Sequence, residues 1–348
     1  LRLRRRLDRL IGTDAGSAPA PRSRRPPRKG TTVLPYIGRR LLLLIPTLLG
    51  FTVVIFLLIR LVPGTVVEQM LGSNALVTGE SVEALRRYFG LDRPLYVQYL
   101  DWLGNLLVGD LGTSWRTGEP VARLVLAHLA VTAELALLSV LLATLVGIPV
   151  GILAALRQNS FLDSLLRIGS LFGLSMPVFW QATMLILILS RLFNWAPPLR
   201  WHGPLADPAA NAQMMVLPAV ALATVSAAVI VRMTRATFLD IMHQDYMRTA
   251  RAKGLGERLV IIRHGLRNVL IPAVTVIGLQ FGYLMGGIVV VEEVFTLPGL
   301  GRLVLNAIYQ RDYPVVQGGV LAIALVFMLV NLVVDLLYAV LDPRIRYA

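Results

Sequence analysis

The sequence predicts an all-α membrane protein with six transmembrane helices and a small helical subdomain on the outer side of the membrane. Composition is the first reason: 56% of the 348 residues are hydrophobic and only 16% are charged, against about 25% charged residues in soluble domains. The mean hydropathy of +0.68 agrees with this. The second reason is that the apolar residues fall into uncharged runs of similar length, as a set of membrane spans requires.

The uncharged runs number six, and each contains 19 to 24 residues. An α-helix rises 1.5 Å per residue, so about 20 residues cross a hydrocarbon core of about 30 Å. Each run is therefore long enough to form one span. The six runs are Leu41–Ile59, Leu135–Leu156, Ile168–Ser190, Pro208–Val231, Asn268–Val291 and Tyr313–Val334.

Small residues recur within two of these runs, as Gly147 with Gly151 and Gly278 with Gly282. Glycines four residues apart share one helix face and let a neighbouring backbone approach closely. The sequence therefore predicts close helix contacts at both pairs.

The positive charge is banded between the apolar runs. Of 34 Lys and Arg residues, twelve lie in the first forty positions and eight lie between Arg232 and Arg267. A net charge of +14 would suit a nucleic-acid-binding protein, but banding argues against a basic globular face. We therefore expect a lipid membrane as partner and no nucleic acid. The absence of Cys excludes disulfides and Cys-based metal or redox sites.

Orientation follows from the basic bands, because Lys and Arg accumulate on the cytoplasmic side. Both termini and the segment Arg232 to Arg267 are expected in the cytoplasm. The predicted organisation is a basic disordered cytoplasmic tail and a first transmembrane helix, followed by an outer helical segment and a five-helix core. The tail is residues 1–35, the first helix is 36–62, the outer segment is 63–129 and the five-helix core is 130–348.

The outer segment is expected to contain short amphipathic helices. Ser81 is positioned to cap a helix that Gly90 ends, and Pro94 is positioned to open a second helix that Gly109 and Gly112 end. The sequence leaves open whether this segment contacts a partner or substrate, or only caps the ends of the spans.

A short helix is also predicted in the basic loop before the fifth span. Asp245 is a possible N-cap, and Gly254 is a natural C-terminal stop. Tyr246, Ala250 and Gly254 share one face, and two of them are small enough to fit closely into a groove. Basic residues near the C-terminal end suit the helix dipole; they are Arg248, Arg251 and Lys253.

This loop resembles the cytoplasmic "EAA" loop of ABC importer permeases, in the form found in dipeptide and oligopeptide importers. The resembling stretch is "YMRTARAKGLGERLVIIRHGLRNVLIP", and the resemblance extends from about Tyr36 over nearly the whole chain. It is most similar to the first of the two permease subunits. The other matching stretches are "FGLDRPLYVQYLDWL", "GDLGTSW", "LFGLSMPVFW", "VVVEEVFTLPGLGRLV" and "DLLYAVLDPRIRY".

The resemblance implies a type I ABC importer permease architecture and an ATP-driven import of peptides. In such a system the loop at 240–270 would couple the chain to a separate ATPase through a docking helix. The expected coupling residues are Tyr246, Arg248, Thr249, Ala250, Arg251, Lys253 and Gly254. The family's acidic first residue is absent near Arg248, and Thr65 stands where the family usually has Asp.

The resemblance also implies that the chain lies in the bacterial cell (inner) membrane and that it has several partners. These are a second homologous permease subunit, two ATP-binding subunits and an extracytoplasmic substrate-binding protein. The chain has no G-x-x-x-x-G-K-[ST] motif, so we expect it to be no enzyme, with ATP and Mg held by the partner ATPase subunits. With four His and no Cys, no metal site or other cofactor is expected.

Four ionisable residues lie at span ends, next to the uncharged runs, where interfacial or structural roles are expected: Glu134, Glu292, Glu293 and Asp335. Ser175, Gln181 and Gln280 lie deeper and could line a translocation path. Alternatives are a permease of the same family for nickel complexes or glutathione, and a secondary transporter or channel that works alone. A membrane enzyme or insertase would need a polar catalytic cluster, which the spans lack.

Overall fold

The computed structural model describes residues 33–61, 67, 79–198 and 200–341. The predicted disordered tail up to residue 32, and Thr65, lie outside the described residues. Within the described residues the regular structure is helical, apart from one isolated β-bridge between Thr113 and Pro120. The prediction of an all-α membrane protein is confirmed.

Five helices are long and apolar enough to cross a membrane, and a bent pair gives up to six spans. The five are α2 (Val33–Leu61), α6 (Val121–Leu156), α9 (Pro208–Met242), α12 (Arg267–Val294) and α14 (Tyr313–Leu341). The third predicted run is not one helix. It is divided between the second half of α7 (Phe161–Ser175) and most of α8 (Val178–Phe193), and the chain bends by 106° between these helices.

The bend between α7 and α8 has a local chemical cause. Pro177 disfavours a helical conformation in the residue before it, and Met176 is accordingly extended, with φ −89° and ψ 131°. The buried Gln181 amide donates to the carbonyl oxygens of Gly173 and Met176, at 3.0 and 2.9 Å. Gln181 therefore supplies hydrogen-bond donors that the end of α7 lacks, and it holds the bend in place.

The closest helix contacts occur at the glycines. A Cβ atom on Gly147 would collide with Ile230, and one on Gly151 would collide with Thr234, both on α9. On α12, Gly278 and Gly282 lie in the same way against α14. Both predicted small-residue pairs are therefore contact points, and α6 packs directly against α9.

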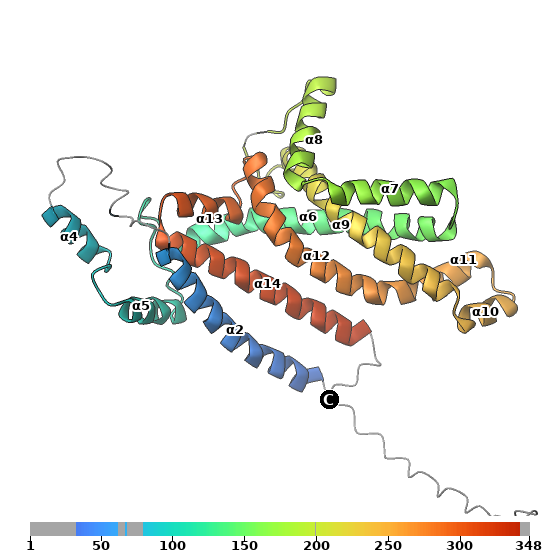
Figure 1. The fold of residues 1–348 in the computed structure, drawn as a ribbon, viewed down its shortest axis with the longest axis horizontal. Helices are drawn as coiled ribbons and strands as arrows, with labels where there is room; N and C mark the ends of the chain where they lie inside the picture. The colour runs from blue at the N-terminus through green and yellow to red at the C-terminus, as the bar shows by residue number, and fades with distance from the viewer. Residues whose placement is uncertain (1–32, 62–66, 68–78, 199, 342–348) are drawn as a thin grey trace, which may run out of the picture.

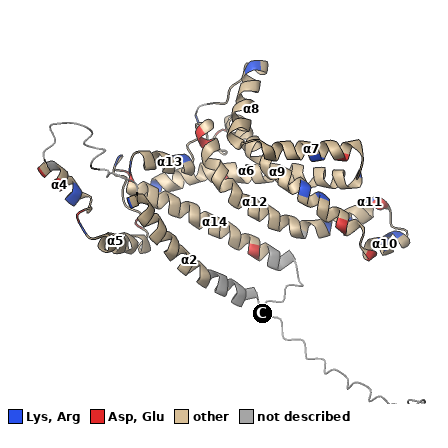
Figure 2. Cartoon of the chain, viewed as in Figure 1, with Lys and Arg blue, Asp and Glu red and all other residues tan. Residues whose placement is uncertain are grey.

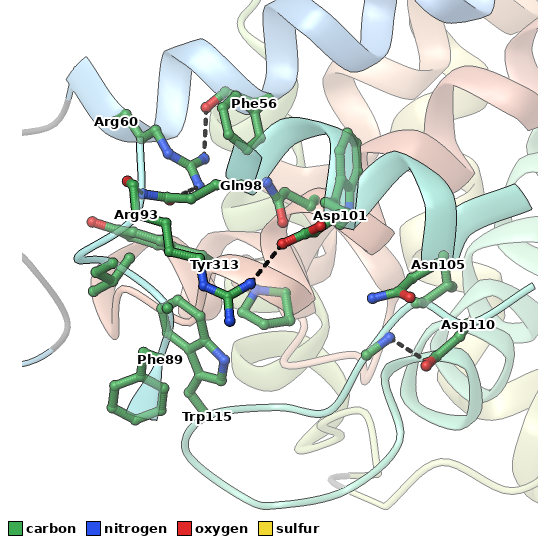
Figure 3. A pocket seen from close by; sticks show the side chains of 17 residues that line it. Phe56, Arg60, Phe89, Arg93, Gln98, Asp101, Asn105, Asp110, Trp115 and Tyr313 are labelled. Carbon is green, nitrogen blue, oxygen red and sulfur yellow. Dashed lines mark hydrogen bonds and ion pairs between the residues drawn. The ribbon is translucent and has the colours of Figure 1, made fainter. Parts of the chain in front are cut away.

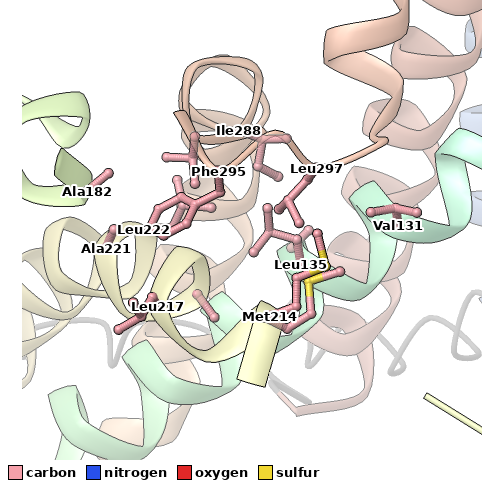
Figure 4. Packing of buried hydrophobic residues seen from close by; sticks show 14 of the residues in the cluster. Val131, Leu135, Ala182, Met214, Leu217, Ala221, Leu222, Ile288, Phe295 and Leu297 are labelled. Atoms are coloured by element: carbon pink, nitrogen blue, oxygen red, sulfur yellow. The ribbon is translucent and has the colours of Figure 1, made fainter. Parts of the chain in front are cut away.

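An apolar cluster joins α6, α9 and α12 (Figure 4). Leu135, Met214 and Ile288 are almost completely buried there. Phe295 and Leu297, from the turn after α12, close the cluster. These three long helices therefore form one packed unit.

A buried ion pair joins α7 to α9. The Asp163 carboxylate has no exposed side-chain surface and accepts two hydrogen bonds of 2.8 Å from the Arg235 guanidinium. The Asn159 backbone N–H donates to the same carboxylate at 3.1 Å. Because the buried carboxylate is bound by two charge-assisted hydrogen bonds, the pair fixes the start of α7 on α9.

Two short helices form a subdomain at one end of the spans, and α10 (Asp245–Ala252) and α11 (Glu257–Leu259) lie at the opposite end (Figure 1). The subdomain contains α4 (Gly79–Tyr88) and α5 (Leu95–Leu107). Pro94 is the N-cap of α5, and Gly90 follows α4 with φ +65°, as predicted. The predicted cap at Ser81 is wrong, because α4 already begins at Gly79.

We predict that Gly151→Ala destabilises the chain, because the added methyl group meets Thr234 and the Val231 carbonyl oxygen. Overpacking of this kind costs about 1–3 kcal/mol. Thermal unfolding of the full-length protein in detergent should show a lower midpoint. Gly50→Ala is the matched control, since nothing lies within 4 Å of its Cβ position. Equal midpoints for the two variants would show that the α6–α9 contact is not tight.

Candidate functional site

The predicted docking helix is present as α10. Its N-cap is Gln244, so the proposed N-cap Asp245 is instead the first helical residue. There its negative charge still favours the positive end of the helix dipole. Gly254 has φ +77°, and its N–H donates to the Arg251 carbonyl oxygen at 2.9 Å. Gly254 therefore ends the helix as predicted, in a left-handed conformation that glycine adopts without strain.

One face of α10 packs on the chain itself, and it includes Ala250 of the predicted small face but not Gly254, which is exposed. Met247 has no exposed surface and Ala250 is 6% exposed. Both belong to a buried cluster that includes Phe238 of α9 and Val260, beyond α11. Ala250 therefore packs within the chain and contributes little to the exposed surface of α10.

The opposite face of α10 is exposed and polar. It presents the side chains of Arg248, Thr249 and Lys253, and Figure 2 shows charged residues of both signs gathered around α10 and α11. Tyr246 is 42% exposed, and its hydroxyl accepts a hydrogen bond of 3.1 Å from the Asn268 amide of α12. This contact fastens α10 to a second long helix.

Arg251 has a structural partner. Its guanidinium donates to both Glu257 carboxylate oxygens, at 2.9 and 3.1 Å. These hydrogen bonds lower the pKa of Glu257 below its ordinary value and raise the pKa of Arg251. Arg251 therefore closes the loop between α10 and α11, which leaves Arg248 and Lys253 as the basic groups on the exposed face.

The chain returns from α11 to α12 through a π-helix, η1 (Val260–Leu266). A Cβ atom on Gly265 would touch the Phe238 ring of α9. Segments of π-helix are rare and occur frequently at functional sites. Here η1 contacts α9, α10 and α12, so it joins α10 to the ends of the two long helices.

A cavity of about 450 Å³ lies among α7, α8, α9 and α12. Gln280 lines it, as does Ser226. Ser175 and Gln181 do not: the Ser175 hydroxyl donates to the Leu171 carbonyl oxygen, and Gln181 holds the bend. Of the three residues predicted to line a path, Gln280 lines this cavity.

Sequence reasoning missed Tyr283 as a lining residue. Gln280, Tyr283, Leu284 and Gly287 all line the cavity, and their spacing of three, four and seven residues places them on one face of α12. The same helical spacing, counted from Gln280, would have identified Tyr283.

A second pocket, of about 230 Å³, lies where α5 meets α2 and α14 (Figure 3). The Arg60 guanidinium donates to the Gln98 side chain at 2.7 Å and lies 3.4 Å from the centre of the Phe56 ring. Arg93 forms an exposed ion pair with Asp101 at 2.9 Å. The predicted alternative in which the subdomain caps the spans therefore has direct support, while the open pocket leaves a surface for a partner.

The ionisable residues at span ends differ in their surroundings. Glu293 forms an ion pair with Arg302 at 3.2 Å and is half exposed, which fits an interfacial role. Glu292 is completely buried. Glu134 has one buried carboxylate oxygen without a partner among the described residues, and Asp335 is partly buried near the end of α14.

Comparison with known proteins identifies two matching family models. Residues 33–136 match the N-terminal part of the binding-protein-dependent transport system membrane component. Residues 147–347 match the binding-protein-dependent transport system inner membrane component. Together they cover most of the chain.

Curated relatives align over 90% of this chain. The dipeptide transport system permease protein DppB of Alkalihalophilus pseudofirmus is 41% identical over 336 residues, covering all of that relative. The di/tripeptide transport system permease protein DppB of Pseudomonas aeruginosa is 44% identical over 335 residues, covering 99% of it. The glutathione transport system permease protein GsiC of Escherichia coli K12 is 42% identical over 315 residues, covering all of it. The chain therefore belongs to the family of inner membrane components of binding-protein-dependent transport systems.

Proposed function

We propose that the chain is a permease subunit of an ATP-driven peptide importer and forms half of the translocation pathway. The observation that carries this proposal is the alignment of dipeptide and di/tripeptide permeases over 90% of the chain at 41–44% identity. Glutathione, named for a relative of similar identity, is the second candidate substrate.

The bundle would be oriented in a bacterial inner membrane with the α10 end in the cytoplasm. Basic residues support this orientation, because eight of them lie between Arg232 and Arg267. The α4–α5 subdomain and both pockets' open surfaces would then be available to other chains. The partners would be a second permease subunit, two ATPase subunits that hold ATP and Mg, and an extracytoplasmic binding protein.

Coupling to the ATPase would depend on the exposed face of α10. Shifting a transporter from 1:99 to 99:1 between two states takes about 5.5 kcal/mol of differential interaction. One exposed ion pair supplies only about 0–1 kcal/mol, so neither Arg248 nor Lys253 could drive the change alone. We therefore propose that α10 transmits motion as a rigid body, since it continues from α9, packs through Met247 and Ala250, and bonds to α12 through Tyr246.

The cavity among α7, α8, α9 and α12 would form this chain's side of the pathway. Its described lining is mostly aliphatic and carries no charged residue, with amide and hydroxyl groups at Gln280, Ser226 and Tyr283. Such a lining would tolerate peptides with varied side chains, because it neither pairs with nor repels a particular charge. Movement of α9 relative to α8 would change the shape of this cavity directly.

Uptake by proteoliposomes that contain the chain with its partner subunits tests the function. We expect labelled Ala-Ala to enter only with ATP on the ATPase side and the binding protein on the other side. An ion gradient without ATP should give no uptake. Uptake of Ala-Ala by the purified chain alone under a proton gradient would contradict the proposal, and uptake of glutathione without Ala-Ala would select the second substrate.

Gly254→Val should reduce uptake while ATP hydrolysis continues, because a β-branched residue at φ +77° is strained by about 1–3 kcal/mol and would shift the end of α10. Gly256→Val is the matched control. Gly256 is also exposed with open space around it, but its φ of −61° suits valine. The ratio of peptide transported to ATP hydrolysed should fall for the first variant only. If the two variants had equal ratios of peptide transported to ATP hydrolysed, the end of α10 would have no part in coupling.

A further inference from the structure

A short helix, α13 (Leu300–Tyr309), lies between α12 and α14 at the end of the bundle that carries the α4–α5 subdomain (Figure 1). Helix α13 contacts α6, α12 and α14. Helix α14 also contacts α2, and α5 of the subdomain packs on α2. A ten-residue helix is not stable by itself in water. The position of α13 is therefore set by the groups that hold its two ends.

Glu292 and Thr132 hold the first end of α13. The Thr132 hydroxyl donates to the buried Glu292 carboxylate at 2.6 Å and accepts from the Leu300 N–H at 2.7 Å. The second Glu292 oxygen accepts from the Arg302 N–H at 2.9 Å. The first N–H groups of a helix lack partners within it, and here α12 and α6 supply these partners.

The glycines before and inside α13 make room for this arrangement. A Cβ atom on Gly299 would overlap the Glu292 carboxylate, and one on Gly301 would overlap Val289. The turn after α12 is thus shaped around a buried carboxylate. Of the two roles expected for Glu292, the structural one holds and the interfacial one does not.

Asp312 holds the other end of α13. It is 3% exposed, and its carboxylate accepts from the Ser114 hydroxyl at 2.5 Å and from the Trp115 N–H at 3.1 Å. The Asp312 N–H donates to the Ala307 carbonyl oxygen at 2.9 Å and ends the helix. Ser114 and Trp115 belong to the loop that follows α5, so this carboxylate joins the subdomain to α13.

Aromatic packing strengthens the same junction. The Trp115 ring lies 5.2 Å from Tyr313 at the start of α14 and 4.6 Å from Phe89 beside α4. All three line the smaller pocket, as Figure 3 shows. A protein that moved the subdomain would therefore move Ser114 and Trp115, and with them the Asp312 end of α13.

We propose that Thr132, Glu292, Ser114 and Asp312 are positioning residues that make α13 a strut between the α4–α5 subdomain and the α6–α12 contact. Through this strut, a peptide-loaded binding protein seated on the subdomain changes how α6 packs against α12 and so promotes ATP hydrolysis at the α10 end. The inference rests on the proposed function, and it adds the route by which occupancy on one side reaches the other.

The test measures ATPase activity of the complete transporter in lipid nanodiscs, with and without peptide-loaded binding protein. Thr132→Val is nearly isosteric and removes the hydroxyl's bonds to Glu292 and to the Leu300 N–H, together with a longer one to the His128 carbonyl oxygen. Ser114→Ala removes the bond to Asp312 and the two bonds that the Ser114 hydroxyl accepts from the N–H groups of Arg116 and Thr117. Each should reduce the stimulated rate by about fivefold or more, the lower range of allosteric coupling. Basal ATPase activity and the affinity for binding protein should stay unchanged.

Two controls separate positioning from general destabilisation. Thr132→Ser keeps the bridging hydroxyl and should restore stimulation. Thr117→Ala alters the same loop as Ser114, but the Thr117 hydroxyl accepts only from the Glu119 N–H among the described contacts, so stimulation should persist. Melting temperatures of all variants are measured in parallel.

Three results would overturn the strut. They are full stimulation in both Thr132→Val and Ser114→Ala, equal loss of basal and stimulated rates, and failure of Thr132→Ser to restore stimulation. The proposed function fails separately, if the wild-type transporter takes up no Ala-Ala with ATP and binding protein present. The two failures are therefore distinguishable.

Discussion

Close packing of α6 against α9 is the constraint on which the rest of the structure depends. Gly147 and Gly151 leave no room for a side chain between the two helices, so the backbones meet directly. Helix α9 then serves as the common support, because α7 is tied to it through Asp163 and Arg235 and α10 continues from its end. If this contact opened, the cavity wall and the α10 surface would lose their fixed relation.

Short helices are attached to the long helices at both ends of the bundle, but the contacts that attach them differ in chemistry. At the α10 end, Met247 and Ala250 pack against α9 while Tyr246 bonds to α12, so the attachment is mostly apolar. At the α13 end the attachments are buried carboxylates, which accept several directed hydrogen bonds each. Hydrogen bonds to the carboxylates define one orientation of α13, whereas apolar packing resists the separation of α10 from the bundle. Transmission of motion from one end of the bundle to the other requires both kinds of contact.

Hydropathy and local chemistry predicted much of the fold, because they depend on neighbouring residues. The long apolar helices, the glycine contacts, the Pro94 cap and the Gly254 stop all follow from such patterns. Long-range pairing was not predictable: Asp163 and Arg235 are 72 positions apart. The bend at Pro177 was missed because an apolar run with one proline suits either a straight or a broken span.

The candidate site shows the same limit. The spacing of Ala250 and Gly254 indicated one small face, but spacing does not say which of its residues packs within the chain: Ala250 is buried, whereas Gly254 is exposed. The answer required α9, which supplies Phe238 and Ile241 to the buried cluster. Likewise, Gln181 was placed correctly inside the apolar region, but its amide serves the bend because the end of α7 offers unpaired carbonyls.

The rigid attachment of α10 is the central claim, and the absence of Cys from the chain allows a direct measurement. Cysteines at Tyr246 and Asn268 can be joined by a short bifunctional thiol reagent, which replaces the hydrogen bond between those side chains by a covalent link. ATP-driven peptide uptake is then compared before and after the reaction. The account predicts that the linked transporter keeps or improves its uptake, since α10 and α12 move together. Loss of uptake on linking, with activity intact beforehand, would show that α10 must move relative to α12 and would contradict the account.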